Sequence, residues 1–224
     1  MTFLELSKLA RQECGIQGSS QPVTVVGQAG ILKRVVDWVA DADIYIQRLH
    51  ADWDFLWATH EPSTTSGSMY LSSPDDLGQW DFESFAVNRG LSDGRPLSKI
   101  TYNEWRSNQS LKTNQPPSQY TSMPNKVIAL EFPADDTYAI YANYWKAPVK
   151  LTANTDTPIF PSEYHRAIIA RVKMWFFEDS ESVELYKLAE KEFKEVLQRL
   201  ELDQLQEYDQ LGLYRPALMS IISV

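Results

Sequence analysis

The stretch from Ile31 to Leu49, which reads ILKRVVDWVADADIYIQRL, decides the fold class of the N-terminal part of this chain. Its apolar residues recur at intervals of three and four positions, so they share one face of a helix. We expect this helix to end near His50, just before the aromatic residues Trp53 and Phe55. A helix with one apolar face must pack against partners, and the flanking sequence supplies them.

Three further helices are expected on either side of this stretch. Near the N-terminus, Thr2 and Glu5 have the spacing of a capping box, and Gly15 is a typical C-terminal stop. After the loop that ends at Pro161, Ser162 is expected to cap a helix whose wide apolar stripe places it at the centre of the core. A last helix is expected to begin around 178–181 and to turn inward the residues Val183, Tyr186, Ala189, Phe193, Val196 or Leu197, and Leu200.

Residues 62–150 have a different character, rich in Pro, Ser, Thr and Asn with aromatic residues alternating with polar ones. Such alternation, broken by Pro- and Asp-containing turns, is typical of antiparallel strands. In this segment, strands are expected at 68–71, 80–85, 126–132 and 138–145, and a short helical turn is expected at 102–108. Outside it, the loop before the helix at 31–49 contains one short β-prone run, Val23–Val26.

Together these patterns predict an α+β fold in which one helical core is interrupted by a β insert. We expect residues 1–61 and 151–209 to form a helical bundle, and residues 62–150 to form an inserted antiparallel β-sheet subdomain. Residues 210–224 are apolar but too few to form a core, so they are predicted to be an extended C-terminal arm. With 224 residues, of which 43% are hydrophobic, the chain is long enough to bury a proper core.

The charge of the chain is acidic and unevenly distributed. The net charge is −9, and residues 178–209 alone hold four basic and eleven acidic residues, a net −7. This balance argues against a protein that binds nucleic acid by neutralising phosphates. The chain has no basic leader and no apolar run near the roughly 20 residues of a membrane span, so we expect neither a signal peptide nor a membrane partner.

Patterns that carry catalysis are missing from the sequence. His50, His60 and His165 are too far apart for a metal-ligand spacing, and Cys14 is the only cysteine, with no evident histidine partner. The Gly27–Gly30 loop fails the phosphate-binding pattern because Lys33 follows Leu32 and precedes Arg34. We therefore predict that the protein is not an enzyme and has no catalytic residues, no cofactor-binding residues and no metal ligands.

Acidic doublets and exposed aromatic residues leave one other function open. Asp75-Asp76 and Asp135-Asp136 are flanked by Pro, and in such turns Asp is favoured for backbone hydrogen bonding rather than proton transfer. The alternative is a carbohydrate- or peptide-binding face on the β insert, although filling a small β core is the interpretation we favour for the same aromatic residues. The six residues concerned are Trp80, Phe82, Trp105, Tyr120, Tyr141 and Trp145.

Several stretches at both ends of the chain resemble one family of proteins. These are TFLEL at 2–6, RQECGI at 11–16, GQAG at 27–30 with LKRVVDWV at 32–39, the run from Ile46 to Leu56, YWKAPVKL at 144–151 and PIFPSEYH at 158–165. They are similar to the head-to-tail adaptor, or connector, proteins of tailed bacteriophages.

The resemblance implies a structural virion protein made in the host cytoplasm and located in the neck. Such proteins form a homo-oligomeric ring, usually of twelve copies, beneath the portal protein. The ring joins the capsid to the tail or nozzle protein and continues the channel through which DNA passes without sequence-specific binding. An alternative within the same context is another neck component, a stopper or a tail-completion protein.

The resemblance and the apolar arm together give the predicted docking residues. The family's helical part and C-terminal arm meet the portal and neighbouring subunits. We expect the arm to bury apolar side chains on its partner, and Arg215 to be its polar anchor because no other charged residue occurs in the last fifteen positions. The predicted portal and subunit docking residues are Leu211, Leu213, Tyr214, Arg215, Leu218 and Ile221. The acidic segment 178–209 is expected to line or approach the DNA passage.

Overall fold

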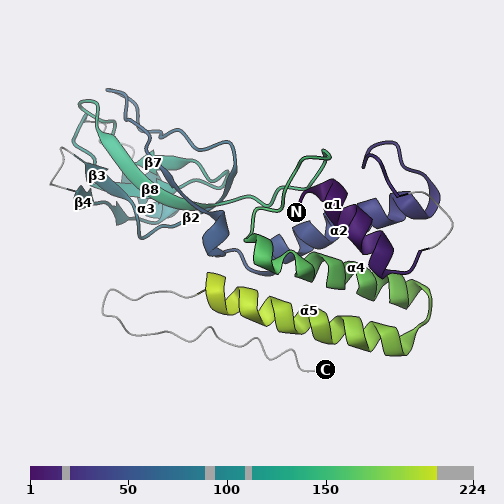
Figure 1. The fold of residues 1–224 in the computed structure, drawn as a ribbon. Coiled ribbons are helices and arrows are strands. Elements are labelled where there is room, and N and C mark those ends of the chain that lie inside the picture. Colours follow the sequence, from purple (N-terminus) through teal and green to yellow (C-terminus); the bar gives the residue numbers. More distant parts are fainter. Residues whose placement is uncertain (17–20, 89–93, 109–112, 206–224) are drawn as a thin grey trace. The chain divides into compact units, whose positions relative to one another are not determined.

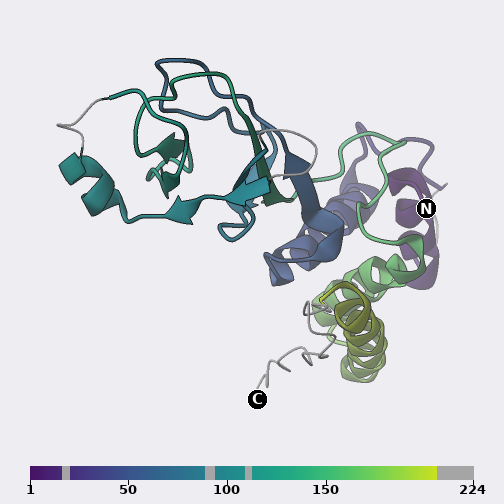
Figure 2. The same cartoon turned by 90° about the vertical axis from the view of Figure 1, so that its left-hand side faces the viewer.

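Residues 1–16, 21–88, 94–108 and 113–205 are described by the computed structural model, and the chain divides into two compact units (Figures 1 and 2). The first unit combines Met1–Phe55 with the chain from Pro148 onward, and the second is Leu56–Ala147. The first unit is helical and the second contains the β-sheets, so the fold is α+β, as predicted.

The described residues of the first unit form four α-helices, one of which packs against the other three. They are α1 (Phe3–Glu13), α2 (Gly30–Leu49), α4 (Arg166–Asp179) and α5 (Val183–Gln204), with a 3-10 turn η3 (Ser162–Tyr164) before α4. Helix α4 packs against α1, α2 and α5, and it buries residues all round its first three turns. The expected central helix is therefore confirmed.

The capping box that opens α1 forms as the sequence indicates. The Thr2 backbone N–H donates to Oε2 of Glu5 at 2.8 Å, and the Glu5 N–H donates back to Oγ1 of Thr2 at 3.3 Å. Phe3, Leu6 and Ala10 are then buried on one face. Two unpaired N–H groups at the helix start are satisfied in this way.

The β-prone run Val23–Val26 forms no strand and stays part of a loop, where the Asn154 side chain accepts a hydrogen bond from the Val25 N–H at 2.7 Å. Two local predictions for the first unit are wrong. Ser162 does not cap α4, which begins at Arg166 after the η3 turn and has no side-chain cap. Residues 180–182 separate α4 from α5, with Glu181 at a φ of 54°, so Val183 begins α5 and is 63% exposed rather than inward.

Within the second unit, the residues that the structure describes form two sheets and a short helix. The larger sheet has the order β1-β8-β3-β4, with β2 also paired to β8, and all of its pairs are antiparallel. The smaller sheet has the order β5-β6-β7, in which β5 and β6 are parallel, unlike the antiparallel pairing expected throughout. The elements are η1 (Asp54–Leu56), β1 (Trp57–His60), β2 (Leu77–Trp80), β3 (Ala86–Asn88), β4 (Gly94–Pro96), β5 (Ser98–Lys99), α3 (Tyr102–Ser107), β6 (Gln119–Ser122), β7 (Ile128–Leu130) and β8 (Ala139–Lys146).

Three of the four predicted strands differ from the structure in extent, and the one predicted at 126–132 is shortened to β7. The stretch 68–71 contributes only an isolated bridge, from Tyr70 to Ala129. The predicted strand 80–85 ends at Trp80, because Asp81 turns the chain by accepting the Glu83 N–H on its side chain and the Ser84 N–H on its carbonyl. Short polar side chains compete in this way with sheet hydrogen bonds.

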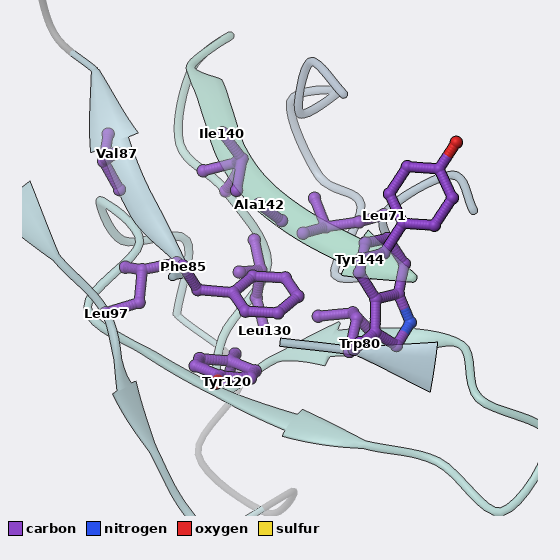
Figure 3. Packing of buried hydrophobic residues seen from close by; sticks show 12 residues of the cluster. Leu71, Trp80, Phe85, Val87, Leu97, Tyr120, Leu130, Ile140, Ala142 and Tyr144 are labelled. Atoms are coloured by element: carbon purple, nitrogen blue, oxygen red, sulfur yellow. The ribbon is translucent and has the colours of Figure 1, made fainter. Parts of the chain in front are cut away.

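The core of the second unit lies between the two sheets (Figure 3). Strand β8 alternates, with Ile140, Ala142 and Tyr144 buried and the residues between them facing outward. Phe85 stacks on Tyr120 with ring centroids 4.3 Å apart. The buried cluster comprises Leu71, Trp80, Phe85, Val87, Leu97, Tyr120, Ile128, Leu130, Ala134, Ile140, Ala142 and Tyr144.

Candidate interaction surfaces

The predicted docking residues of the arm cannot be placed. Leu211, Leu213, Tyr214, Arg215, Leu218 and Ile221 all lie outside the described residues. Their role therefore stays a prediction, and the surfaces below belong to residues that the structure describes.

His165 and Cys14 are both buried in the helical unit. His165 is buried and its Nε2 lies 3.2 Å from the carbonyl oxygen of Phe160, and burial lowers the pKa of its imidazole. Burial likewise raises the pKa of the Cys14 thiol to about 12, which leaves it uncharged at neutral pH. Among the described residues, no three His, Cys, Asp or Glu side chains gather in a metal-binding group.

The acidic doublets take part in turns of the second unit. Asp76 accepts a hydrogen bond from the Tyr144 hydroxyl at 2.8 Å and lies 3.6 Å from Nζ of Lys146. Asp135 accepts from the Tyr138 hydroxyl at 2.8 Å. These carboxylates hold loops against β8 and against Tyr138, the residue just before it, which fits the structural interpretation of the doublets.

The aromatic residues considered for a ligand-binding face do not share a surface. Trp80, Trp105 and Tyr120 are 3%, 6% and 0% exposed, so no ligand reaches their rings, and Phe82 packs against the same buried cluster. The Trp105 indole donates to the Leu130 carbonyl at 2.8 Å. For these residues the core interpretation holds and the binding-face interpretation is wrong.

The outer face of the larger sheet carries a smaller aromatic group. Trp57 of β1 pairs in register with Trp145 of β8, and Tyr141 lies farther along the same face of β8. Trp57 is 49% exposed and Tyr141 is 38% exposed. The Trp145 indole N–H is buried and has no acceptor within the described chain. Trp57 was missing from the predicted face, although it begins the strand that pairs with β8.

A hollow lies along the seam between α2 and α4 in the helical unit. Its volume is about 420 Å³, and it is lined by Trp38 and Asp41 of α2 and by Trp175, Glu178 and Asp179 of α4. Both tryptophans fall on the apolar stripes of their helices, yet each remains partly exposed. We call this hollow the α2–α4 groove.

Two arginines of the chain already lie on the rings of the α2–α4 groove. The Arg34 guanidinium sits 4.7 Å from the centroid of the Trp38 ring and pairs with Asp179 at 2.7 Å. The Arg171 guanidinium sits 4.7 Å from the Trp175 ring and 4.4 Å from that of Tyr45. Aromatic faces beside carboxylates attract guanidinium groups through the ring quadrupole and ion pairing together.

The three carboxylates that line the groove differ in their ion pairing. Asp41 pairs with Lys150 at 2.5 Å, and Asp179 is held by Arg34. Glu178 is exposed and has no ion pair within the part of the chain that the structure describes.

The acidic segment 178–209 is not one uniform face. Of its eleven carboxylates, six lie on α5, three at 178–181 and two beyond the described residues. Helix α5 also holds four basic residues, so its own net charge is −2. Four of its carboxylates are paired, namely Glu190 with Lys194, Glu192 with Arg166 and Lys173, Glu195 with Lys191, and Glu201 with His50.

The comparison with protein families settles the relationship of the chain. The model of the SU10 adaptor protein family matches residues 1–216, which is nearly the whole sequence. The chain belongs to the SU10 adaptor family. This is a family of phage head-to-tail adaptors, so the protein is a component of the virion neck that acts in assembly. A comparison with curated proteins finds no match.

The adaptor has no span that would cross a bilayer within its described helices. No helix in the described ranges is both long enough and apolar enough for one. The family match covers residues of both units and extends to residue 216.

Proposed function

We propose that this adaptor is a structural protein that assembles as a ring beneath the portal, joins the capsid to the tail and continues the DNA channel. The observation that carries the proposal is the family match over residues 1–216. In the ring, each copy meets two neighbours, the portal on the capsid side and a tail or nozzle protein on the other side. Twelve copies are the expected number.

Charge supports passage of DNA rather than binding of it. The chain has a net charge of −9, and eight of its 21 basic residues form ion pairs with carboxylates within the described part of the chain. A protein that bound phosphates tightly would need clustered, unpaired Lys and Arg. DNA moving through such a ring would meet few attractive contacts, and those would carry no sequence preference.

Docking to the portal is assigned to residues 210–224 as part of the proposal. Ordering such an arm on the portal costs conformational entropy, and burial of its leucine, tyrosine and isoleucine side chains offsets that cost. Arg215 would supply a bidentate contact to a portal carboxylate.

Electron microscopy of the protein mixed with purified portal from the same phage tests this function. Class averages should show one additional ring on the tail-facing end of the portal, with the rotational symmetry of twelve copies. Portal alone and adaptor alone are the controls. A mixture whose averages are identical to portal alone contradicts the proposal. Extra density that appears only after a tail protein is added favours the stopper or tail-completion alternative.

A further inference from the structure

The α2–α4 groove has a complementary surface on another side of the same helical unit. Leu185, Leu188 and Arg199 follow one line along α5, at spacings of three and eleven residues that fall on the same side of a helix with 3.6 residues per turn. The two leucines are 45% and 65% exposed. Arg199 is exposed and has no ion pair among the described residues.

The orientation of α5 places this line away from α2. Glu192 lies on the same line and reaches Arg166 and Lys173 of α4, and those two residues also pair with Glu13 of α1. Glu201 instead contacts His50 at the end of α2. It follows Glu192 by nine residues, which are two and a half helical turns, so it lies on the opposite side of α5. The α5 line therefore faces the α1 side of the unit, while the groove is on the α2 side.

The two surfaces match in charge and in character. The groove, which Glu178 lines together with Trp38 and Trp175, offers a carboxylate without an ion pair among the described residues, and the α5 line offers the Arg199 guanidinium, which also has none there. The groove already holds guanidinium groups on both rings, at 4.7 Å from each. Leu188 and Leu185 lie on the same side of α5, about 16 and 21 Å along its axis from Arg199, and burial of their exposed side chains against a second copy would be favourable.

We propose that neighbouring copies of this adaptor associate head to tail, with Arg199 of one copy entering the α2–α4 groove of the next and pairing with Glu178. A contact between two different faces of the same chain is heterologous, and it builds a ring where the rotation that relates neighbouring copies closes on itself. This inference rests on the proposed ring function and names the contact that would build the ring.

Site-directed cross-linking tests the contact directly. Two variants, Glu178→Cys and Arg199→Cys, are made in a Cys14→Ala background and joined with a short bis-maleimide, first as free proteins and then bound to purified portal. A cross-linked dimer is expected only when the two variants are mixed, and a ladder is expected from a chain that carries both cysteines. Lys187→Cys, which places a thiol on a different side of α5, should give no dimer with Glu178→Cys.

The outcomes separate this contact from the proposed function. Rings on the portal without the 178–199 product overturn the contact and leave the ring function standing. No ring on the portal, in electron micrographs of the same samples, contradicts the ring function itself. Dimers formed by Glu178→Cys alone or Arg199→Cys alone would mean a symmetric contact and would also overturn the proposal.

Charge reversal provides a second measurement that needs no thiol chemistry. Glu178→Arg or Arg199→Glu alone should weaken the association of copies on the portal at least about tenfold, since each places like charges together. The double variant restores one opposite pair at every contact and should recover most of that loss. Lys187→Glu makes the same charge change as Arg199→Glu elsewhere on α5 and should leave association unchanged. Failure of the double variant to recover, with both single variants folded, overturns the pairing.

Discussion

Gly78 occupies a place in the second unit where no side chain fits. It lies at the irregular pairing between β2 and β8, and an added Cβ would come within 2.7 Å of the Lys146 carbonyl oxygen and 2.8 Å of that of Trp145. Both neighbours are backbone atoms of the central strand β8, so moving either one would disturb the sheet at a cost in free energy. We expect Gly78→Ala to lower the free energy of unfolding by about 1–3 kcal/mol, measured by urea denaturation. Gly94→Ala, in open space on β4, is the control and should change it by less than about 0.5 kcal/mol.

Asp43 makes the stability of the helical unit depend on pH. Its side chain is fully buried on α2, and burial raises its pKa to about 7, although a hydrogen bond from Gln47 acts in the opposite direction. Its Oδ1 has no hydrogen-bond partner in the described structure. The unfolded chain releases this proton near pH 4, whereas the folded chain keeps it until about pH 7. The contribution of Asp43 to stability is therefore lost as pH rises across that window, by roughly 1.4 kcal/mol per pH unit.

Asp43→Asn tests this pH dependence. The amide keeps an acceptor for Gln47 and cannot ionise, so urea unfolding should show the variant about 2–3 kcal/mol more stable relative to wild type at pH 8 than at pH 5. Asp37→Asn, at an exposed carboxylate paired with Lys33, should change by the same small amount at both pH values. If wild type and Asp43→Asn have parallel pH profiles from 5 to 8, Asp43 is ionised in the folded protein and the prediction is wrong.

An ion-pair network joins three of the helices in the first unit. Glu13 at the end of α1 and Glu192 of α5 each contact both Arg166 and Lys173 of α4. Burial alone would raise the pKa of Glu192, but hydrogen bonds from Lys173 and Arg166 outweigh it and hold that pKa below its ordinary value. The side chains are mostly shielded, with Lys173 only 16% exposed. A network in such a position contributes more than separate surface pairs do.

Glu192→Gln should therefore destabilise the protein by about 1–3 kcal/mol at pH 7 in urea unfolding. Since the pKa is lowered in the folded state, the contribution of Glu192 is complete above its unfolded value near 4.3 and disappears as pH falls below it. The difference between variant and wild type should accordingly shrink at pH 3–4. Glu195→Gln, whose exposed carboxylate lies 3.9 Å from Lys191, should cost less than about 0.5 kcal/mol at either pH. Equal effects of the two variants at pH 7 would contradict the role of the network.

Helices were predicted from the sequence better than strands, for a physical reason that particular residues show. The period of α2 and the capping box of α1 are local signals, and both appear as expected. Asp81, by contrast, ends a strand through hydrogen bonds with its own neighbours, and the parallel pairing of β5 with β6 depends on residues about twenty positions apart. Ser162 has the right neighbours for a helix cap, but a 3-10 turn intervenes before α4.

The candidate surfaces were less predictable than the fold because they depend on how helices pack. Trp38 and Trp175 fall on the apolar stripes of their helices, and only the packing of α2 against α4 shows that they line a partly open groove. Arg171 gave no sequence signal, since the rings that surround it come from three helices. Alternation alone is enough to assign the even-numbered residues of β8 to a core. The sequence does not indicate what would cover Trp57 and Tyr141, which are exposed on the other face of the same sheet.

At the scale of the whole molecule, the described residues form their cores without the arm. The core residues of both units lie between Phe3 and Leu200, and α5 closes with buried Leu200 before residue 206. We therefore expect that truncation after Asp209 leaves the circular dichroism spectrum and the midpoint of thermal unfolding within a few degrees of the full chain. The same truncation should abolish co-sedimentation with portal, because the proposed docking residues all lie in 210–224.

Arg215→Gln in the full chain separates the polar anchor from the apolar part of the arm. Removing one charge-assisted contact should weaken co-sedimentation with portal about tenfold or more, whereas removing the whole arm should eliminate it. Lys187→Gln, which neutralises an exposed residue of α5, is the matched control and should bind portal as the full chain does. If the chain truncated after Asp209 still co-sediments with portal, docking belongs to the helical or β unit and the arm proposal is wrong. If Arg215→Gln binds portal as the full chain does while the truncated chain does not bind, the arm docks through its apolar side chains alone.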